Sequence, residues 1–269
     1  MTGLRETAFA KLNLALHVRE KLPDGYHRIE TIFAFCEDGD EVSAEHASAP
    51  SLKLSGEFAG GLGRSDNLVE KAANALREAC DVNESAALTV QKRLPVASGL
   101  GGGSADAAAT LRLLSRLWNL PTPIERLEEV GRGLGADVAA CVRSESVRGA
   151  NRGDVLTPVD IGLSGTPALL INPRVELRTA DVFARWDGVD RGELEEWREG
   201  RNDLEAAAMS MVPQIATILA WLSAQRGANF VRMSGSGATC FALFDSDSAC
   251  DHSAMAVPRE WWSLRTRLR

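Results

Sequence analysis

The regular alternation of apolar and polar side chains near the N-terminus predicts a half-buried strand. Apolar residues occupy every second position from Ala8 to Val18, and Lys11 and Asn13 fall on the opposite set. Successive side chains of a strand point to opposite faces, so Lys11 and Asn13 are expected to project the same way. A solvated strand lysine is the simpler interpretation of Lys11.

Further apolar runs predict a chain that mixes strands and helices. The expected strands cover 29–35, 41–45, 51–55, 87–92, 168–171 and an apolar stretch that ends at 244. The expected helices cover 68–80, 104–118, 124–134, 179–186 and 213–226, and another opens near 202. Turns or loops are expected at 22–27, 60–65 and 187–200, and a break between strands at 38–40. The segment 144–158 is expected to form a hairpin or a crossover. The tail 264–269 fits none of these elements.

The most unusual stretch is 94–117, where glycines stand between the strand 87–92 and an Ala- and Leu-rich helix. The glycines are Gly99, Gly101, Gly102 and Gly103. Glycine permits positive φ and close approach of a ligand, so consecutive N–H groups can point inward together. Ser104 stands where the N-cap is expected, and the helix would direct its unpaired N–H groups and dipole at the loop. We therefore predict a phosphate site.

Neither common phosphate-binding pattern fits this loop. The Walker pattern ends in Gly-Lys-Ser/Thr, whereas these glycines lead into Ser104, Ala105 and Asp106. The dinucleotide fingerprint fails because its sixth position, counted from Gly99, is Ser104. A flexible connector or a tight strand-to-helix turn remains the alternative.

Tyr26 and His27 follow a Pro-Asp-Gly turn signal, and Tyr26 is the only tyrosine of the chain. Such a pair can stack on a flat ring and form hydrogen bonds with its edge. The alternative is a turn in which Tyr26 covers the core and His27 faces water.

Helix capping competes with ligand binding as the interpretation of two asparagines. Asn67, or Asp66 before it, suits the N-cap of the helix 68–80, and a ligand role fits Asn67 equally well. The spacing of Asn202 and Glu205 suits a capping box, which explains that motif by itself.

Asp137 lies among small and apolar residues directly after a helix stop at Gly135. A buried carboxylate needs a partner or a task, because burial of an unpaired charge is costly. The simpler interpretation is that Asp137 caps the next short helix.

Length and composition fit a globular protein with a substantial core. The chain has 269 residues, 45% hydrophobic and 25% charged, and no apolar run approaches the roughly 20 residues of a membrane span. The N-terminus lacks the apolar core of a signal peptide, so we expect a cytoplasmic protein. The net charge of −7 disfavours a nucleic-acid surface.

The cysteines agree with a reducing compartment. They are odd in number, scattered and never in a C-x-x-C pair, which argues against a disulfide framework and a zinc site. They are Cys36, Cys80, Cys141, Cys240 and Cys250, which we expect to be reduced and mostly buried.

Together these motifs resemble those of the GHMP small-molecule kinases over nearly the whole chain. The three motifs of the superfamily correspond to 10–14, the ATP-phosphate loop 95–105 and 234–239. Four further motifs are similar to the branch that acts on a cytidyl-linked substrate, namely 24–27, 101–103, 135–138 and 202–205.

The resemblance implies that Asp137 accepts the proton of an attacking hydroxyl and that Lys11 orients or acidifies it. Phosphoryl transfer needs a positioned base and cationic relief of charge, and opposite charges within about 4–6 Å favour both ionised forms. ATP phosphates, bridged by Mg²⁺, would lie on the loop residues Pro95, Val96, Ala97, Ser98, Gly99, Leu100, Gly101, Gly102, Gly103, Ser104 and Ala105. Adenine would lie near Asn67 and Lys92.

The implied acceptor is a cytidine diphosphate-linked methylerythritol, whose tertiary 2-hydroxyl would receive the γ-phosphoryl group of ATP. Its cytosine ring would stack between Tyr26 and Phe183, with His27 at the polar edge. Asn13 and Thr179 would line the same site.

The implied fold is α+β and two-lobed, with the active site in the cleft. An N-terminal ATP-binding domain would cover 1–158 and a ferredoxin-like C-terminal substrate domain 159–269. The expected partners are the small-molecule substrate and ATP, with no nucleic acid or membrane, in a monomer or a weak homodimer.

The chain departs from the family pattern at three places. Ala105 stands where relatives often have a second serine, Ala97-Ser98 replaces residues that are commonly glycine, and Ala139 replaces a common proline. None of these changes the proposed pair of Lys11 and Asp137. Two rivals stay open: a GHMP kinase for another small alcohol, homoserine-like or mevalonate-like, and a nucleotide-binding regulator without catalysis.

Overall fold

A computed structural model describes residues 3–61 and 67–269 and divides the chain into two compact units. Unit 1 comprises 1–10, 38–96 and 101–144, and unit 2 comprises 11–37, 97–100 and 145–269. Two long N-terminal strands and the glycine loop therefore give residues to both units. The mixture of helices and strands confirms the predicted α+β class.

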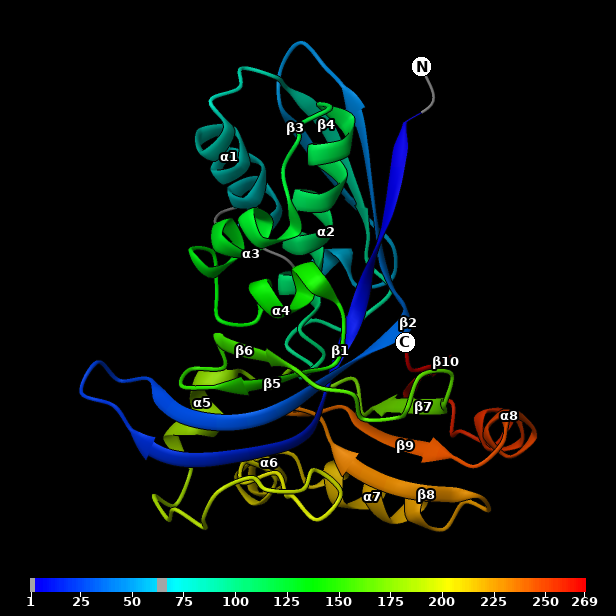
Figure 1. The fold of residues 1–269 in the computed structure, drawn as a ribbon. Coiled ribbons are helices and arrows are strands. Elements are labelled where there is room, and N and C mark those ends of the chain that lie inside the picture. The colour runs from blue at the N-terminus through cyan, green and yellow to red at the C-terminus, as the bar shows by residue number, and fades with distance from the viewer. Residues whose placement is uncertain (1–2, 62–66) are drawn as a thin grey trace. The chain divides into compact units, whose positions relative to one another are not determined.

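Figure 1 shows the order of the elements along the chain. The strands are β1 (Leu4–Lys21), β2 (His27–His46), β3 (Ser51–Ser55), β4 (Ala86–Gln91), β5 (Val147–Ala150), β6 (Val155–Pro158), β7 (Pro167–Asn172), β8 (Ala228–Met233), β9 (Cys240–Phe244) and β10 (Trp262–Arg267). The helices are α1 (Leu68–Cys80), α2 (Gly102–Leu117), α3 (Ile124–Arg132), α4 (Val138–Arg143), α5 (Thr179–Ala184), α6 (Glu205–Met211), α7 (Gln214–Ser223) and α8 (Asp247–Met255), with a short 3-10 helix η1 (Ala59–Gly61).

In unit 1 the strand β4 lies between β3, which runs parallel to it, and the last part of β2, which is antiparallel. Helices α1, α2, α3 and α4 pack on one another, as the upper part of Figure 1 shows. Helix α1 begins where predicted, because the Asn67 side chain accepts a hydrogen bond from Val69 N at 2.9 Å. Asp66, the other proposed cap, lies outside the described residues.

The predicted break at 38–40 is wrong, because β2 continues through this Asp-Gly-Asp segment. Gly39 packs against the neighbouring backbone so closely that a Cβ atom would lie 1.8 Å from Ala8 O. The Asp40 carboxylate is buried and accepts hydrogen bonds from Arg93 N and Leu94 N. Gly39 allows close packing and Asp40 belongs to a buried hydrogen-bond network, so the composition of this segment wrongly predicts a turn.

In unit 2 an antiparallel sheet has the strand order β10-β7-β9-β8. Helices α7 and α8 pack on this sheet, and every residue of β7 is buried. The segment 144–158 forms the predicted hairpin, in which β5 pairs with β6. Elsewhere in this unit, β2 pairs with β5.

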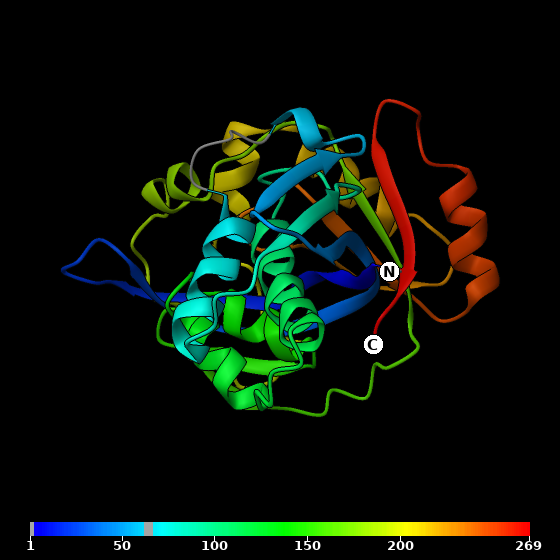
Figure 2. The same ribbon diagram turned by 90° about the horizontal axis from the view of Figure 1, so that it is seen from above.

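The tail that fitted no predicted element forms β10, which pairs with β7. Figure 2 shows β10 beside α8. Arg265 and Arg267 form ion pairs with Asp247 of α8, and Arg265 also pairs with Asp251 at 2.7 Å. Pairing with the neighbouring helix therefore explains two of the three arginines of the tail.

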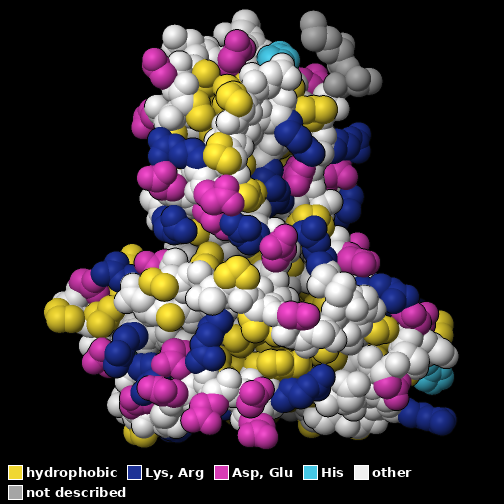
Figure 3. Space-filling view, viewed as in Figure 1, with side chains coloured by type: hydrophobic (Ala, Val, Ile, Leu, Met, Phe, Trp, Pro, Cys, Tyr) yellow, Lys and Arg dark blue, Asp and Glu magenta, His cyan; other side chains and the backbone are white. Residues whose placement is uncertain are grey.

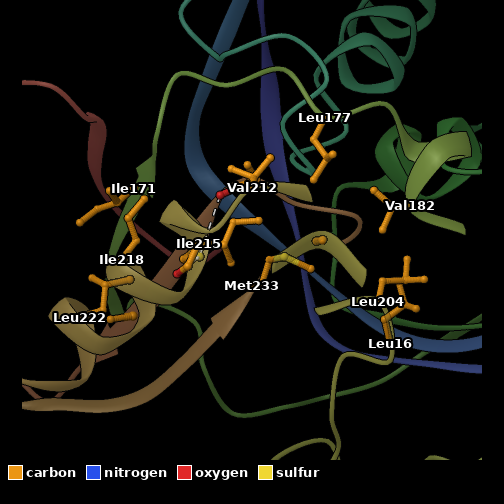
Figure 4. Close-up of a cluster of buried hydrophobic side chains, with 14 of the residues drawn as sticks. Leu16, Ile171, Leu177, Val182, Leu204, Val212, Ile215, Ile218, Leu222 and Met233 are labelled. Atoms are coloured by element: carbon orange, nitrogen blue, oxygen red, sulfur yellow. Dashed lines mark hydrogen bonds between the residues drawn. The ribbon is translucent and has the colours of Figure 1, made fainter. Parts of the chain in front are cut away.

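The core of unit 2 joins the sheet to α5, α6 and α7. Apolar side chains from β1, β7, β8 and these helices point toward one another in Figure 4. The labelled members are Leu16, Ile171, Leu177, Val182, Leu204, Val212, Ile215, Ile218, Leu222 and Met233. Cys240 is buried in this cluster, and four of the five cysteines are buried, which confirms that they are mostly buried.

Positive and negative side chains are interspersed over the face in Figure 3, so the net charge of −7 is not gathered into one field there. Within residues 3–61 and 67–269, no helix combines the length and the apolar character that a membrane crossing requires.

The close approach at Gly39 predicts a strong effect of one added methyl group. Gly39→Ala should lower the free energy of unfolding by about 3 kcal/mol or more, because backbone atoms must move to accept the Cβ. Gly60→Ala is the matched control, since a Cβ there meets nothing within 4 Å. Urea unfolding measures both variants, and equal midpoints would contradict this account of β2.

Candidate active site

The glycine loop connects β4 to α2, and the helix begins earlier than predicted. Its N-cap is Gly101, with φ 65° and ψ 22°, and Gly102 is the first helical residue. Ser104 is therefore inside the first turn and is not the N-cap, which corrects the prediction. Gly101 adopts the left-handed region at little cost, so the chain turns into the helix there.

The start of α2 is accessible, since Gly103 is exposed and Gly101 and Gly102 are half-buried. Helix N–H groups of the first turn have no intrahelical partners and carry the positive end of the helix dipole. The accessible start of α2 therefore presents donors and partial positive charge, the combination that binds phosphate.

The middle of the loop, 97–100, is anchored in unit 2 through four consecutive carbonyl groups. The donors are Leu177 N to Ala97 O at 3.3 Å, Thr239 N to Ser98 O at 3.1 Å, Ser234 Oγ to Gly99 O at 2.9 Å and Lys11 N to Leu100 O at 2.9 Å. These bonds use the oxygen atoms of the loop and none of its N–H groups. These four bonds hold the loop backbone in place without using the N–H groups of the loop.

Close packing explains why Gly99 is required in this loop. Its φ is 81°, and a Cβ atom would lie 2.2 Å from Ser234 O. Ala97 also adopts positive φ, at 49°. The loop therefore keeps its left-handed residues even where the sequence departs from glycine, at some cost in strain.

Lys11 and Asn13 lie side by side in unit 2, as the strand alternation predicted. The ammonium of Lys11 donates to Asn13 Oδ1 at 2.8 Å and lies 5.0 Å from the centre of the Phe33 ring. Asn13 Nδ2 donates to Thr31 Oγ1 at 2.8 Å, and that hydroxyl donates to Ala15 O. Lys11 is only 4% exposed, so the interpretation as a solvated strand lysine is wrong.

Asp137 belongs to unit 1 and occupies the N-cap position of α4. Its side chain makes no capping hydrogen bond to this helix in the described part of the chain. The capping interpretation therefore does not account for a carboxylate at this position.

Phe183, one of the two predicted base-stacking residues, lies in an aromatic group of unit 2 with His27 and Trp186. The rings of His27 and Phe183 lie 4.7 Å apart, and Trp186 meets His27 edge-on at 5.7 Å. Tyr26 is 56% exposed, and the Arg152 guanidinium lies 4.5 Å from its ring centre. The alternative interpretation, in which Tyr26 covers the core, is therefore wrong.

The surroundings of His27 favour the neutral form of its imidazole ring. Burial lowers its pKa below the ordinary 6.5, and the positive charge of Lys21 lowers it further. A neutral imidazole has one donor and one acceptor nitrogen, so it can pair with a base edge that offers both.

Thr179 opens α5 and shares a hydrogen bond with Ser236, with 2.9 Å between the two hydroxyl oxygens. Ser236 belongs to the motif 234–239, so the predicted substrate residue and this motif meet directly in unit 2.

Asn202 does not form the predicted capping box, because the N-cap of α6 is Leu204. Asn202 Oδ1 accepts from Leu204 N, while its Nδ2 donates to Met233 O and Gly235 O at 2.8 Å each. Asn202 therefore fastens the start of α6 to the motif 234–239. The short spacing of the motif could not reveal this distant partner.

Of the two residues predicted near adenine, Asn67 caps α1 and Lys92 is buried in unit 1. The Lys92 ammonium bonds to the carboxylates of Asp40 and, at 2.6 Å, Asp106. Burial acts to lower the pKa of Lys92, but the two carboxylates outweigh it and the pKa is raised. Burial raises the pKa of Asp106 to about 7 against the opposing charge of Lys92.

Sequence reasoning missed the partners that hold these residues, in particular Thr31, Asp40 and Asp106. Thr31 and Asp40 lie on β2, in a segment whose pattern predicted only ordinary strands and a turn. Asp106 follows the glycines, but helical periodicity gives no sign that it reaches Lys92 across the loop.

The fold and this site define a class of protein, and family models identify it. The model "GHMP kinases N terminal domain" matches residues 67–145, and "GHMP kinases C terminal" matches 185–251. The chain therefore belongs to the GHMP kinase family, a family of small-molecule kinases, as the sequence motifs predicted.

Relatives narrow the comparison further. The chain is 50% identical to the 4-diphosphocytidyl-2-C-methyl-D-erythritol kinase of Novosphingobium aromaticivorans, over 99% of this chain and 93% of the relative. It is 51% identical to the kinase of the same name from Rhizorhabdus wittichii, over 98% and 94%. A crystal structure of 4-(cytidine 5'-diphospho)-2C-methyl-D-erythritol kinase matches with a TM-score of 0.84 at 28% identity, covering 98% of this chain and 99% of that one.

The contact of His27 with Phe183 predicts the titration of the imidazole. An NMR titration of the ring should give a midpoint below 6.5, because burial disfavours its protonation. Phe183→Ala exposes the ring and should raise the midpoint toward 6.5. Lys21→Gln is the control and should raise it less, since the lysine is the smaller cause. A wild-type midpoint at or above 6.5 would contradict this environment.

Proposed function

We propose that this chain catalyses the ATP-dependent phosphorylation of the 2-hydroxyl of 4-diphosphocytidyl-2-C-methyl-D-erythritol. The products are the 2-phosphate and ADP, in the non-mevalonate (methylerythritol phosphate) pathway of isoprenoid biosynthesis. One observation carries the proposal: relatives with this name are 50% and 51% identical over nearly the full length of both chains.

The phosphates of ATP bind at the glycine loop in this proposal. The accessible first turn of α2 offers N–H groups and a positive dipole end, and the loop is anchored through its carbonyls alone. Adenine lies near Asn67 and Lys92 in this proposal. Of these two, the ammonium of Lys92 is already bonded to carboxylates, so a contact with adenine would come from other parts of that residue.

Lys11 and Asp137 supply the chemistry in this proposal. The substrate 2-hydroxyl oxygen attacks the γ-phosphorus, the bond from that phosphorus to the β,γ-bridging oxygen breaks, and ADP leaves. Asp137 accepts the hydroxyl proton, and Lys11 offsets negative charge on the oxygen and the moving phosphoryl group. Lys11 is prepared for this role by burial and by its bond to Asn13, which fixes the ammonium.

Mg²⁺ enters with ATP in this proposal and neutralises charge on the phosphates. The ion usually binds through one or two carboxylates together with substrate phosphates, keeping several waters. Residues 3–61 and 67–269 hold no group of three or more His, Cys, Asp and Glu side chains suited to a metal.

The cytosine ring stacks between Tyr26 and Phe183, with His27 at its edge. Exposure of Tyr26 and the neutral state of His27 support this assignment. Asn13 and Thr179 line the remainder of the acceptor site. The proposal also includes domains that cover 1–158 and 159–269, a cytoplasmic location, and a monomer or weak homodimer.

The first test measures ADP release with Mg-ATP and, separately, the cytidyl-methylerythritol substrate, homoserine, mevalonate or no acceptor. Turnover is expected only with the cytidyl compound.

Asp137→Asn should lower that turnover by several orders of magnitude with an unchanged circular dichroism spectrum, because the proton acceptor is lost. Turnover with another alcohol would favour the related kinase, and an active Asp137→Asn variant would contradict the proposed base.

Tyr26→Ala separates the cytidyl substrate from other acceptors. It should raise the KM for the cytidyl substrate about tenfold or more, equivalent to about 1.4 kcal/mol, because a stacking surface is lost. The KM for ATP should stay unchanged. Val155→Ala, at another exposed apolar position of unit 2, is the control. An unchanged KM in Tyr26→Ala would count against the cytidyl assignment.

A further inference from the structure

Three charged side chains of unit 1 form a buried group beside the glycine loop. Asp40, Lys92 and Asp106 are 0%, 3% and 4% exposed. Lys92 Nζ donates to Asp40 Oδ2 and, at 2.6 Å, to Asp106 Oδ2. One ammonium therefore joins two carboxylates that are far apart in the chain.

This group connects the two ends of the loop. On the entry side, Lys92 directly follows β4, and Asp40 Oδ1 accepts from Arg93 N at 2.5 Å and Leu94 N at 2.9 Å. On the exit side, Asp106 belongs to α2. A single buried lysine thus bonds the segment that enters the loop to the helix that leaves it.

The first residue of α2 lies directly over the same group. A Cβ atom at Gly102 would be 3.5 Å from Lys92 Nζ and 3.6 Å from Asp40 Oδ2. Gly102 is half-buried and Gly103 is exposed, so the buried charges support the part of the helix that faces outward.

Stabilisation of the fold does not explain why these three charged residues are buried together. Buried ion pairs seldom stabilise a fold more than apolar side chains of similar volume would. Asp106 Oδ1 is buried and has no hydrogen-bond partner among the described residues, which adds a further cost. A costly group at this place is explained by the position that it fixes.

We propose that Asp40, Lys92 and Asp106 form a clamp that fixes the distance between the two ends of the glycine loop and thereby positions its N–H groups for the phosphates of ATP. The three are positioning residues, since they act through the loop backbone. This inference rests on the proposed function only in taking the loop as the phosphate site. A displacement of reacting groups by about 1 Å can lower the reaction rate about a hundredfold, so fixing the position of the loop would matter for catalysis.

Asp106→Leu tests the clamp. It removes the bond to α2 but leaves Lys92 and Asp40 as a balanced pair, so the variant is expected to fold. Asp106→Asn is the conservative variant, because its amide oxygen still accepts from Lys92. Glu128→Ala is the matched control: it removes another buried carboxylate of unit 1, which pairs with Arg143 on α4. If Asp106→Leu does not fold, Asp106→Ser replaces it.

Calorimetry measures the Kd of each purified variant for Mg-ADP and for magnesium tripolyphosphate, a probe without a base. Asp106→Leu should weaken binding of both by about tenfold or more, whereas Asp106→Asn and Glu128→Ala should stay within about threefold of wild type. A role in stability alone would lower the melting temperature of Glu128→Ala and Asp106→Leu alike and leave both Kd values unchanged.

The outcomes separate this inference from the proposed function. Binding of both probes by wild type with unchanged Kd values in Asp106→Leu overturns the clamp alone. Weakening for Mg-ADP but not for tripolyphosphate also overturns it, because Asp106 would then act on the base. Nucleotide binding and a clamp effect without phosphorylation of the cytidyl compound overturn the proposed acceptor and leave the clamp. Failure of wild type to bind either probe overturns both.

Discussion

A loop that binds phosphate with its own N–H groups must be held in shape by other atoms. In this protein four consecutive carbonyls, from Ala97 to Leu100, accept hydrogen bonds from backbone or hydroxyl donors of unit 2. The next residues begin α2, whose first N–H groups have no helical partner. The anchoring thus uses oxygen atoms and leaves donors for a ligand, and the rest of the site is arranged around that division.

Strand β2 supplies support to both units through residues that look ordinary in the sequence. Thr31 holds Asn13, which in turn holds the Lys11 ammonium. Further along the same strand, Asp40 binds Lys92 and the backbone that enters the loop. Lys11 also donates its backbone N–H to Leu100 O, so the proposed catalytic lysine and the glycine loop are joined by a main-chain hydrogen bond.

Much of the fold and the candidate site could be predicted from the sequence. Period-2 alternation gave β1 and placed Lys11 beside Asn13, and apolar helical faces gave α1 and α2. Glycine density identified the loop, because few other structures need so many residues without a Cβ atom. The family motifs then provided the proposed roles of Lys11 and Asp137, which no periodicity could suggest.

The remaining features depend on partners far away in the chain. The Asp-Gly-Asp sequence predicts a break because such residues usually end a strand, whereas burial of Asp40 and three hydrogen bonds to its carboxylate keep β2 continuous. The spacing of Asn202 predicts a capping box, yet its side-chain amide donates to residues more than thirty positions later. The strand β10 is rich in arginine because α8 supplies its acidic partners, which local composition cannot indicate.

The central claim is that the glycine loop is the nucleotide phosphate site, and hydrogen–deuterium exchange of the loop amides tests it most directly. Peptides covering 95–105 would be followed with and without Mg-ADP at a concentration that saturates binding. We predict slower exchange in this segment, because phosphate oxygens accept hydrogen bonds from its N–H groups. Unchanged exchange there, with protection confined to other segments of a protein that binds the nucleotide, would contradict the account.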